Sequence, residues 1–351
     1  MLPTLLGLML SCSHKGSDSA QTKWNVYAGC ASTGMIYVLD GDSLTILDSI
    51  PGMREVNKIE PSPDGRWLYV QSHSELRQST LSRIDVMTGT VTKVLPSDSY
   101  SDVAVVKNGA RLLHGDPLCN DEVIDPVSLT VLNEVTDTLC RRRGPTNGSK
   151  VAALTIAAAA DRGSTPFTLS DSILRVVDVE SGNVYGSYRP HLMSGGPLAF
   201  PYDAIVHPDG VRVLAIAPGG GHKAWFVIGD VLTGETVFQH ELQSPFGEVA
   251  ISSDGNWAAV SDPGQFLMSE GHQPTLDIFD LKAMNRLKRF NMFSAQIRFY
   301  PDNRRLLSGP RNRTDTGGAL RIIDLGTLSV VRDQSPFSGP LGGAIAVGVR
   351  P

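Results

Sequence analysis

The chain has 351 residues, of which 41% are apolar and 19% are charged, and its formal net charge is −5. This balance provides enough apolar material for a large core, and it offers no global basic field that would hold nucleic acid or an anionic membrane. It excludes disordered, coiled-coil and collagen-like chains. Beyond the N-terminus no apolar run approaches the ~20 residues that cross a bilayer, which excludes a polytopic membrane protein.

The first 23 residues are predicted to be an export signal and a tether rather than part of the fold. Residues 1–11 are mostly apolar and stop at Cys12, and residues 12–23 are polar and rich in serine. An apolar stretch, a small residue and then Cys resemble the lipobox of bacterial lipoproteins, in which that Cys is lipidated and becomes the mature N-terminus. The resemblance implies a signal peptide over residues 1–11, export to the bacterial periplasm or cell surface, and a flexible tether over residues 12–23. An ordinary cleaved signal peptide is the alternative.

One motif recurs seven times along the rest of the chain. It is an apolar stretch that closes on Asp, a small turn, and a second apolar stretch. The closing residues, spaced by about 47 positions on average, are Asp40, Asp85, Asp125, Asp178, Asp230, Asp280 and Asp324. Between the copies lies a second motif with a Pro-Asp-Gly-like turn, as in residues 59–72 and 205–217. Asp-Gly and Thr-Gly pairs favour tight hairpins, so each unit predicts four short strands.

Four-stranded units repeated every 40–50 residues are typical of a β-propeller. We therefore predict an all-β fold over residues 24–351: a seven-bladed β-propeller of four-stranded antiparallel blades. The first unit lacks an innermost strand, and one apolar stretch is left over at the C-terminus. We expect residues 343–349 to complete the blade that also contains residues 35–40 and 44–50, so that the C-terminal strand closes the ring in the first blade.

The motif sequences also carry a family resemblance. The stretches WLYVQS (residues 67–72) and SRIDVMTGTVTKVL (residues 82–95) resemble the YVTN/YncE-like branch of propeller proteins, and the resemblance spans roughly residues 24–351. It implies the fold and is nearly silent on activity. The repeating Asp residues are interpreted as turn formers, so replacing Asp85 or Asp178 by Ala should lower the melting temperature without changing ligand affinity.

Three cysteines lie beyond the N-terminal segment: Cys30, Cys119 and Cys140. They allow at most one internal disulfide. Cys119 and Cys140 fall on neighbouring predicted strands, and an oxidising compartment would let them pair. Small buried thiols are the alternative. No Cys-x-x-Cys motif supports a thiolate zinc site.

The candidate binding residues lie where the repeat is interrupted. In the fifth to seventh units the connections between the second and third strands are long and rich in Gly or charged residues. Propellers carry functional sites on such loops at the mouth of the central channel, and long loops on a rigid scaffold commonly bind ligands. The predicted ligand-binding set is His222, Lys223, Glu270, His272, Arg311 and Arg313. Its mixed charges favour an envelope protein, a peptide or a small polar molecule, and loops without a function are the alternative.

Metal binding and phosphate binding are the two specific chemistries that the residues of these connections suggest. A metal site would need His114, His222 and His272 to converge with Asp203 and Glu270, but the eight histidines show no ligand spacing, so no metal is expected. A phosphate cradle at residues 218–223 (PGGGHK) lacks the following helix and the Gly-Lys-Ser/Thr ending of a P-loop. No cofactor is expected.

Two functions remain from different classes. The first is an exported, membrane-tethered monomer that acts as a binding scaffold in the cell envelope and meets the membrane only through its lipid anchor. The second is a lactonase-like hydrolase: seven-bladed lactonases resemble this chain in fold, and Glu270, His272 and Arg311 could imitate their site at the channel mouth. No nucleic-acid partner is expected for either function.

Overall fold

The protein is seen in a computed structural model that describes residues 23–30, 33–51, 55–73, 79–97, 102–115, 121–135, 139–143, 150–156, 172–181, 183–196, 198, 201, 203–219, 223–243, 247–262, 273–309, 319–334 and 344–351. In these residues the regular structure is almost entirely strand, with one short 3-10 turn, η1 (Lys107–Gly109). All strand pairings are antiparallel and every sheet has four strands. The predicted all-β organisation in four-stranded antiparallel sheets is confirmed.

The first three sheets follow the chain, except that the last strand joins the first sheet. Sheet 1 contains β28 (Ile345–Val349), β1 (Trp24–Cys30), β2 (Met35–Asp40) and β3 (Ile46–Pro51). Sheet 2 contains β4 (Val56–Pro61), β5 (Trp67–His73), β6 (Ser79–Asp85) and β7 (Thr90–Ser97). Sheet 3 contains β8 (Asp102–Val106), β9 (Arg111–Gly115), β10 (Asp121–Ile124) and β11 (Val131–Val135).

The other sheets of the described chain repeat this order. Sheet 4 contains β12 (Leu139–Arg143), β13 (Lys150–Ile156), β14 (Ser172–Asp178) and β15 (Val184–Tyr188). Sheet 5 contains β16 (Asp203–Val206), β17 (Arg212–Pro218), β18 (Ala224–Asp230) and β19 (Thr236–Leu242). Sheet 6 contains β20 (Val249–Ile251), β21 (Trp257–Asp262), β22 (Thr275–Asp280) and β23 (Asn285–Phe290). Sheet 7 contains β24 (Gln296–Phe299), β25 (Arg305–Gly309), β26 (Leu320–Asp324) and β27 (Ser329–Gln334).

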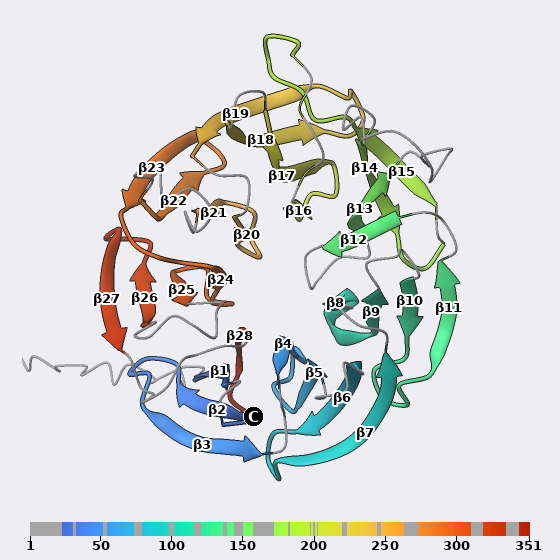
Figure 1. Cartoon of the computed structure of the whole chain (residues 1–351), viewed down its shortest axis with the longest axis vertical. Coiled ribbons are helices and arrows are strands. Elements are labelled where there is room, and N and C mark those ends of the chain that lie inside the picture. Colours follow the sequence, from blue (N-terminus) through green and yellow to red (C-terminus); the bar gives the residue numbers. More distant parts are fainter. Residues whose placement is uncertain are drawn as a thin grey trace, which may run out of the picture.

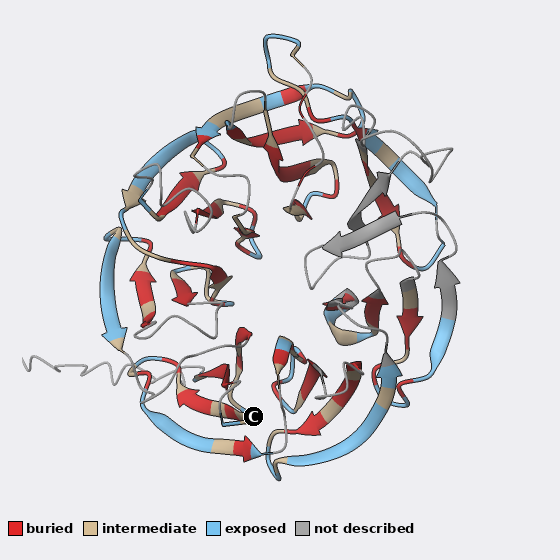
Figure 2. Ribbon diagram, in the orientation of Figure 1, coloured by how far each residue is buried: buried red, intermediate tan, exposed pale blue. Residues whose placement is uncertain are grey.

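The sheets are arranged around a common centre, with the first strand of each sheet inside and the fourth outside (Figure 1). Among the described residues each hydrophobic cluster is shared by two sheets that follow one another, and one cluster joins sheet 7 to sheet 1 through Leu307, Ile322, Val26 and Ile345. The outermost strands are largely exposed while the inner strands are buried (Figure 2). A single sheet cannot bury both of its faces, so the core of this fold lies between the sheets.

The C-terminal strand takes the innermost place in sheet 1. β28 pairs with β1 from Trp24 opposite Val349 to Ala28 opposite Ile345. One expected boundary is wrong: the fourth strand of this sheet begins at Ile46, not at Leu44. Leu44 has φ 58 and belongs to the preceding turn. Its side chain is fully buried, which offsets the cost of a left-handed backbone in a non-glycine residue.

The repeating Asp residues hold the turns between the third and fourth strands. In each of the seven copies one carboxylate oxygen accepts backbone N–H groups two or three residues further on. A β-bulge on the fourth strand follows each turn, and where the structure describes it the fifth turn residue has positive φ. In four copies the backbone N–H of that fifth residue (Leu44, Gly89, Leu129 and Gly234) donates to the carbonyl of the Asp, so the turn spans five residues, as in an α-turn. The structural interpretation of these residues is confirmed.

We expect Asp125→Ala to lower the free energy of unfolding by about 1 kcal/mol at neutral pH, since the turn loses its acceptor. The backbone N–H and hydroxyl of Ser128 lower the pKa of Asp125. A group with a depressed folded-state pKa stabilises the protein above about pH 4, its unfolded value, and this contribution is lost as the pH falls through the folded value. Denaturant unfolding at neutral and acid pH tests this, with Asp48→Ala, an exposed carboxylate outside the turns, as control. A pH-independent difference would contradict it.

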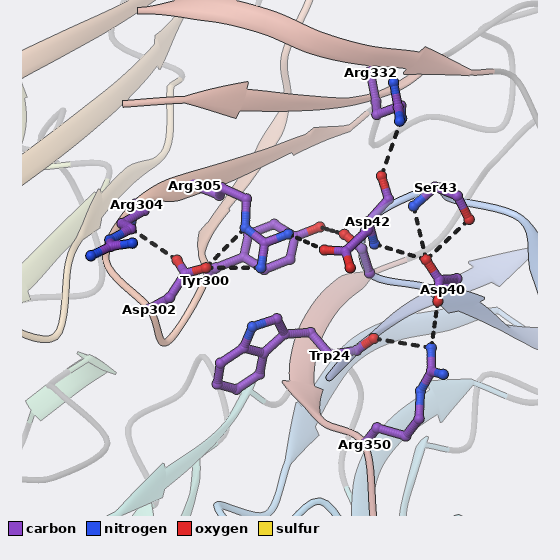
Figure 3. A network of polar contacts seen from close by, with 11 residues as sticks. Trp24, Asp40, Asp42, Ser43, Tyr300, Asp302, Arg304, Arg305, Arg332 and Arg350 are labelled. Carbon is purple, nitrogen blue, oxygen red and sulfur yellow. Dashed lines mark hydrogen bonds and ion pairs between the residues drawn. The ribbon is translucent and has the colours of Figure 1, made fainter. Parts of the chain in front are cut away.

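Polar contacts join sheet 7 to sheet 1 on the face where both termini of the described chain lie (Figure 3). The Tyr300 hydroxyl donates to the carbonyl of Gly41 at 2.8 Å, and the Arg305 guanidinium, stacked on the Tyr300 ring, binds Asp42. Arg350 donates to Asp40 Oδ2 at 2.7 Å. Although partial burial acts to raise the pKa of Asp40, these donors and the turn N–H groups hold it well below its usual range.

Candidate functional site

The antiparallel order divides the connections between two faces of the ring. Turns between the first and second strands and between the third and fourth strands lie on one face, which we call the turn face. Connections between the second and third strands, together with the links from one sheet to the next, lie on the other, which we call the candidate face. The residues predicted to bind a ligand all fall in connections of the candidate face.

Lys223 is the one predicted ligand-binding residue that the structure describes. It lies directly before β18, and its Nζ is 3.0 Å from Oε1 of Glu241 on β19, with both side chains about half exposed. An exposed pair of this kind is screened by water and leaves both charges available to a ligand. His222 precedes it in the connection between β17 and β18, outside the described residues.

The other predicted residues also lie outside the described residues. Glu270 and His272 belong to the connection between β21 and β22, and Arg311 and Arg313 to the connection between β25 and β26. Their convergence stays a prediction, as does the lactonase-like hypothesis that depends on three of them.

Charge is buried on the two strands that flank, in the sequence, the connection with Glu270 and His272. Asp262 ends β21 and Asp277 lies two residues into β22, and each side chain is only 1% exposed. Arg289 on β23 donates Nε and Nη2 to the two oxygens of Asp277 at 2.8 and 2.6 Å. This bidentate bond, with Asp262 nearby, raises the pKa of Arg289. Acidic side chains are rarely buried without such a partner.

The charged cluster reaches into the neighbouring sheet. His240 on β19 lies with Nε2 4.0 Å from Asp277 and 3.2 Å from Nη1 of Arg286, and its ring contacts Phe279. Burial lowers the pKa of His240, which favours the neutral imidazole. The arrangement therefore fixes sheets 5 and 6 relative to each other below the candidate face.

A row of acceptors at the start of the innermost strands was only partly foreseen. Asp203 Oδ2 accepts the backbone N–H of Val249 in the next sheet at 2.8 Å. In the same way Glu248 Oε2 accepts from Ile297 at 2.9 Å, and Gln296 Oε1 accepts from Ile345 at 2.8 Å. The acceptors recur 45 and 48 residues apart, which is the signal that the sequence offered. Of these acceptors only Asp203 is named from the sequence, as a residue considered for metal binding, and Glu248 and Gln296 are missed.

Glu248 also forms an ion pair with an arginine of the neighbouring sheet. Its Oε1 accepts from Nη1 of Arg298 on β24 at 2.7 Å, and both side chains are largely buried. With Lys223 and Glu241 this gives the candidate face fixed charges of both signs over sheets 5 to 7.

The other residues considered for metal or disulfide chemistry are distributed over different sheets. His114 on β9 lies 3.2 Å from the carboxylate of Glu122 on β10 in sheet 3, far along the chain from Asp203. Among the described residues no group of three His, Cys, Asp or Glu is placed to hold a metal ion. Cys30 is buried in β1. Cys12, Cys119 and the Cys140 side chain lie outside what the structure describes, so the lipid and the disulfide stay predictions.

Solved structures, but no family model and no curated protein, match this chain. A Kuenenia stuttgartiensis hydrazine synthase structure is 19% identical with a TM-score of 0.55, over 77% of this chain and 78% of that chain. The dihydro-heme d1 dehydrogenase NirN in complex with DHE is 16% identical with a TM-score of 0.56, over 88% and 72%. A functionally unknown protein from Desulfotomaculum acetoxidans DSM 771 is 15% identical with a TM-score of 0.65, over 93% and 99%.

The fold is that of a β-propeller. The first two of these neighbours are known propellers, and the four-stranded sheets around one centre agree with them. At identities below 20% the likeness concerns the fold alone. Within the described ranges there is also no helix of the length and apolar character that a membrane span requires.

Proposed function

We propose that this protein is an exported, lipid-anchored seven-bladed propeller of the YVTN/YncE-like kind. In this proposal it acts as a binding scaffold in the cell envelope, and its candidate face takes an envelope protein, a peptide or a small polar molecule. The observation that carries the proposal is the pair of buried carboxylates, Asp262 on β21 and Asp277 on β22, with Arg289 bound to Asp277. In the sequence these two strands flank the long connection that contains Glu270 and His272. Buried charge concentrates at functional sites more often than elsewhere.

The distribution of buried charge singles out sheet 6 from its neighbour. At the positions equivalent to Asp262 and Asp277, sheet 5 has Ala217 and Val227, both fully buried. Apolar side chains therefore suffice to pack these positions in this fold, and a buried ion pair is weak evidence for stability alone. A binding site for a polar partner would explain why sheet 6 has a buried ion pair at these positions.

Closure of the ring is part of the proposal because a binding face spread over sheets 5 to 7 must be rigid. The side chain of Gln296 accepts a hydrogen bond from the backbone N–H of Ile345 in β28. Asp203 and Glu248 each accept one in the same way from a backbone N–H of the next sheet. This series of contacts supports β28 as the innermost strand of a seventh blade. We infer that the C-terminal strand closes the ring and fixes the loops of the candidate face.

The anchor is tested by mass spectrometry of the native protein from membrane and soluble fractions. We expect the mature chain to begin at an acylated Cys12 and to sediment with membranes, and Cys12→Ser to release it. Cleavage elsewhere with a soluble product would reduce the proposal to plain secretion, and retention of Met1 in the cytoplasm would reject export.

Binding is tested with the triple variant Glu270→Ala, His272→Ala, Arg311→Ala. We expect cross-linking of wild-type protein in intact envelopes to give a defined adduct that the triple variant loses, with an unchanged melting temperature. Lys282→Ala on the turn face is the matched control and should keep the adduct. Both proteins are also assayed against lactones, since turnover by wild type alone would favour the hydrolase. Unchanged behaviour in both assays would place the site elsewhere.

A further inference from the structure

The chain enters the propeller on the turn face, opposite the candidate face. Trp24, the first residue of β1, pairs with Val349 at the end of β28, and the backbone N–H of Arg350 donates to the carbonyl of Lys23 at 2.9 Å. The turn at Gly65 packs on the same end of β28: a Cβ on Gly65 would lie 2.1 Å from the Val349 carbonyl oxygen. The N-terminal segment therefore leaves the fold among the turns.

We propose that the turn face lies against the lipid bilayer that holds the anchor, so that the candidate face points away from the membrane. This inference rests on the proposed function, because it uses the lipid at Cys12. The eleven steps from Cys12 to Lys23 reach at most about 40 Å even when fully extended. A domain of this size has a radius of gyration of about 20 Å. The greatest reach of the tether is thus about twice this radius, which lets the face from which it emerges meet the bilayer directly.

The tips of the turn face carry apolar side chains that suit the boundary between headgroups and acyl chains. Met87, Val127 and Leu232 stand two positions after a repeating Asp, where the Asp carboxylate accepts their backbone N–H. They are 69%, 70% and 59% exposed, and of the described large apolar residues only Met193 is comparable. Turn positions normally favour polar residues. The equivalent positions of the other sheets are polar or Gly: Asp42, Glu180, Lys282 and Gly326.

Charge on this face is balanced rather than basic. The repeating Asp carboxylates are engaged by backbone N–H groups, and Asp42 is bound by Arg305. Exposed residues at the turns carry both signs: Asp64, Glu180 and Asp254 are acidic, and Arg66, Lys282 and Arg304 are basic. Contact with the bilayer is therefore driven by the anchor and the apolar tips, and we expect little dependence on anionic lipid.

The test uses full-length acylated protein in vesicles of phosphatidylethanolamine and phosphatidylglycerol with brominated acyl chains, which quench nearby indoles. Val127→Trp and Leu232→Trp add an indole on the turn face, and Lys223→Trp adds one on the candidate face. After subtraction of the emission of the four native Trp residues, we expect the turn-face indoles to lose about half of their emission and Lys223→Trp to lose none, as for side chains at the headgroup boundary.

The outcomes separate the two proposals. If mass spectrometry finds no lipid on Cys12, the anchor of the proposed function fails and the docking surface falls with it. If the lipid is present but the turn-face indoles are not quenched, only the docking surface is wrong. Quenching of Lys223→Trp instead would show the opposite orientation. Equal quenching in phosphatidylcholine vesicles would support the apolar contact, and loss of quenching there would overturn it in favour of a charge-driven one.

Discussion

Deletion of residues 342–351 is expected to abolish cooperative unfolding. The deletion removes β28, which supplies Ile345 and Ala346 to the clusters on both sides of sheet 1. Loss of one buried Ile and its smaller neighbours alone costs about 3–5 kcal/mol. That is a large part of the 5–15 kcal/mol that stabilises a typical protein. The edge of β1 is also left without partners for its backbone groups.

The experiment compares thermal unfolding of the truncated and full-length chains by circular dichroism. We expect the sharp transition to be replaced by a broad one, with exposed apolar surface that binds a hydrophobic dye. Deletion of residues 1–22 is the matched control, because the sequence predicts a signal peptide and a tether there, and it should leave the transition unchanged. A synthetic peptide of residues 342–351 should restore part of the transition. A truncated protein with an unaltered melting temperature would show that the ring does not need its C-terminal strand.

The fold could be predicted because its signals repeat. Each Asp acts within five residues of its own position, so the motif that marks the turn also contains the groups that bind it. The strand boundary at Leu44 could not be predicted in the same way. The motif has Gly at the left-handed position in Gly89 and Gly234, but Leu44, Leu129 and Met284 take the same conformation. In the sequence, a leucine at that position looks like the start of the next apolar strand. Only its burial in the folded protein offsets the unfavourable left-handed backbone of the turn.

The candidate site was predictable as a place but not as a set of contacts. Interrupted repeats indicate which connections differ, whereas the partner of Asp277 depends on register. A bulge between Ile278 and Phe279 shifts the pairing by one residue, so that Asp277 faces Arg289 rather than Lys288. A shift of one residue moves a side chain to the other face of a sheet. The acceptor role of Glu248 depends on Ile297 in the next sheet, 49 residues further along the chain. A local sequence pattern does not reveal a partner so far away.

The second large effect is expected from Arg289→Met, which keeps the aliphatic stem and removes the charge. Asp277 is 1% exposed and would lose both hydrogen bonds, with Arg286 remaining at 3.7 Å. An ion left buried without its partner typically costs about 3–5 kcal/mol. We therefore expect a fall in the free energy of unfolding of that order, measured by denaturant titration.

Sheet 7 contains a matched control for Arg289→Met, because it has the same cross-strand pair with the charges exchanged. Arg321 on β26 donates Nε to Asp333 on β27 at 3.0 Å, at the register position of Asp277 and Arg289. Asp333 is 54% exposed, so Arg321→Met leaves a carboxylate that water solvates, and an exposed pair contributes about 0.2–1 kcal/mol.

Asp277→Asn in the Arg289→Met background should recover most of the stability, since a neutral amide needs no counter-charge. Equal losses in the two sheets, or no recovery in the double variant, would show that burial of Asp277 does not set the cost. If the double variant folds as well as wild type yet loses the envelope adduct, the buried pair serves the binding face and not the stability of the propeller.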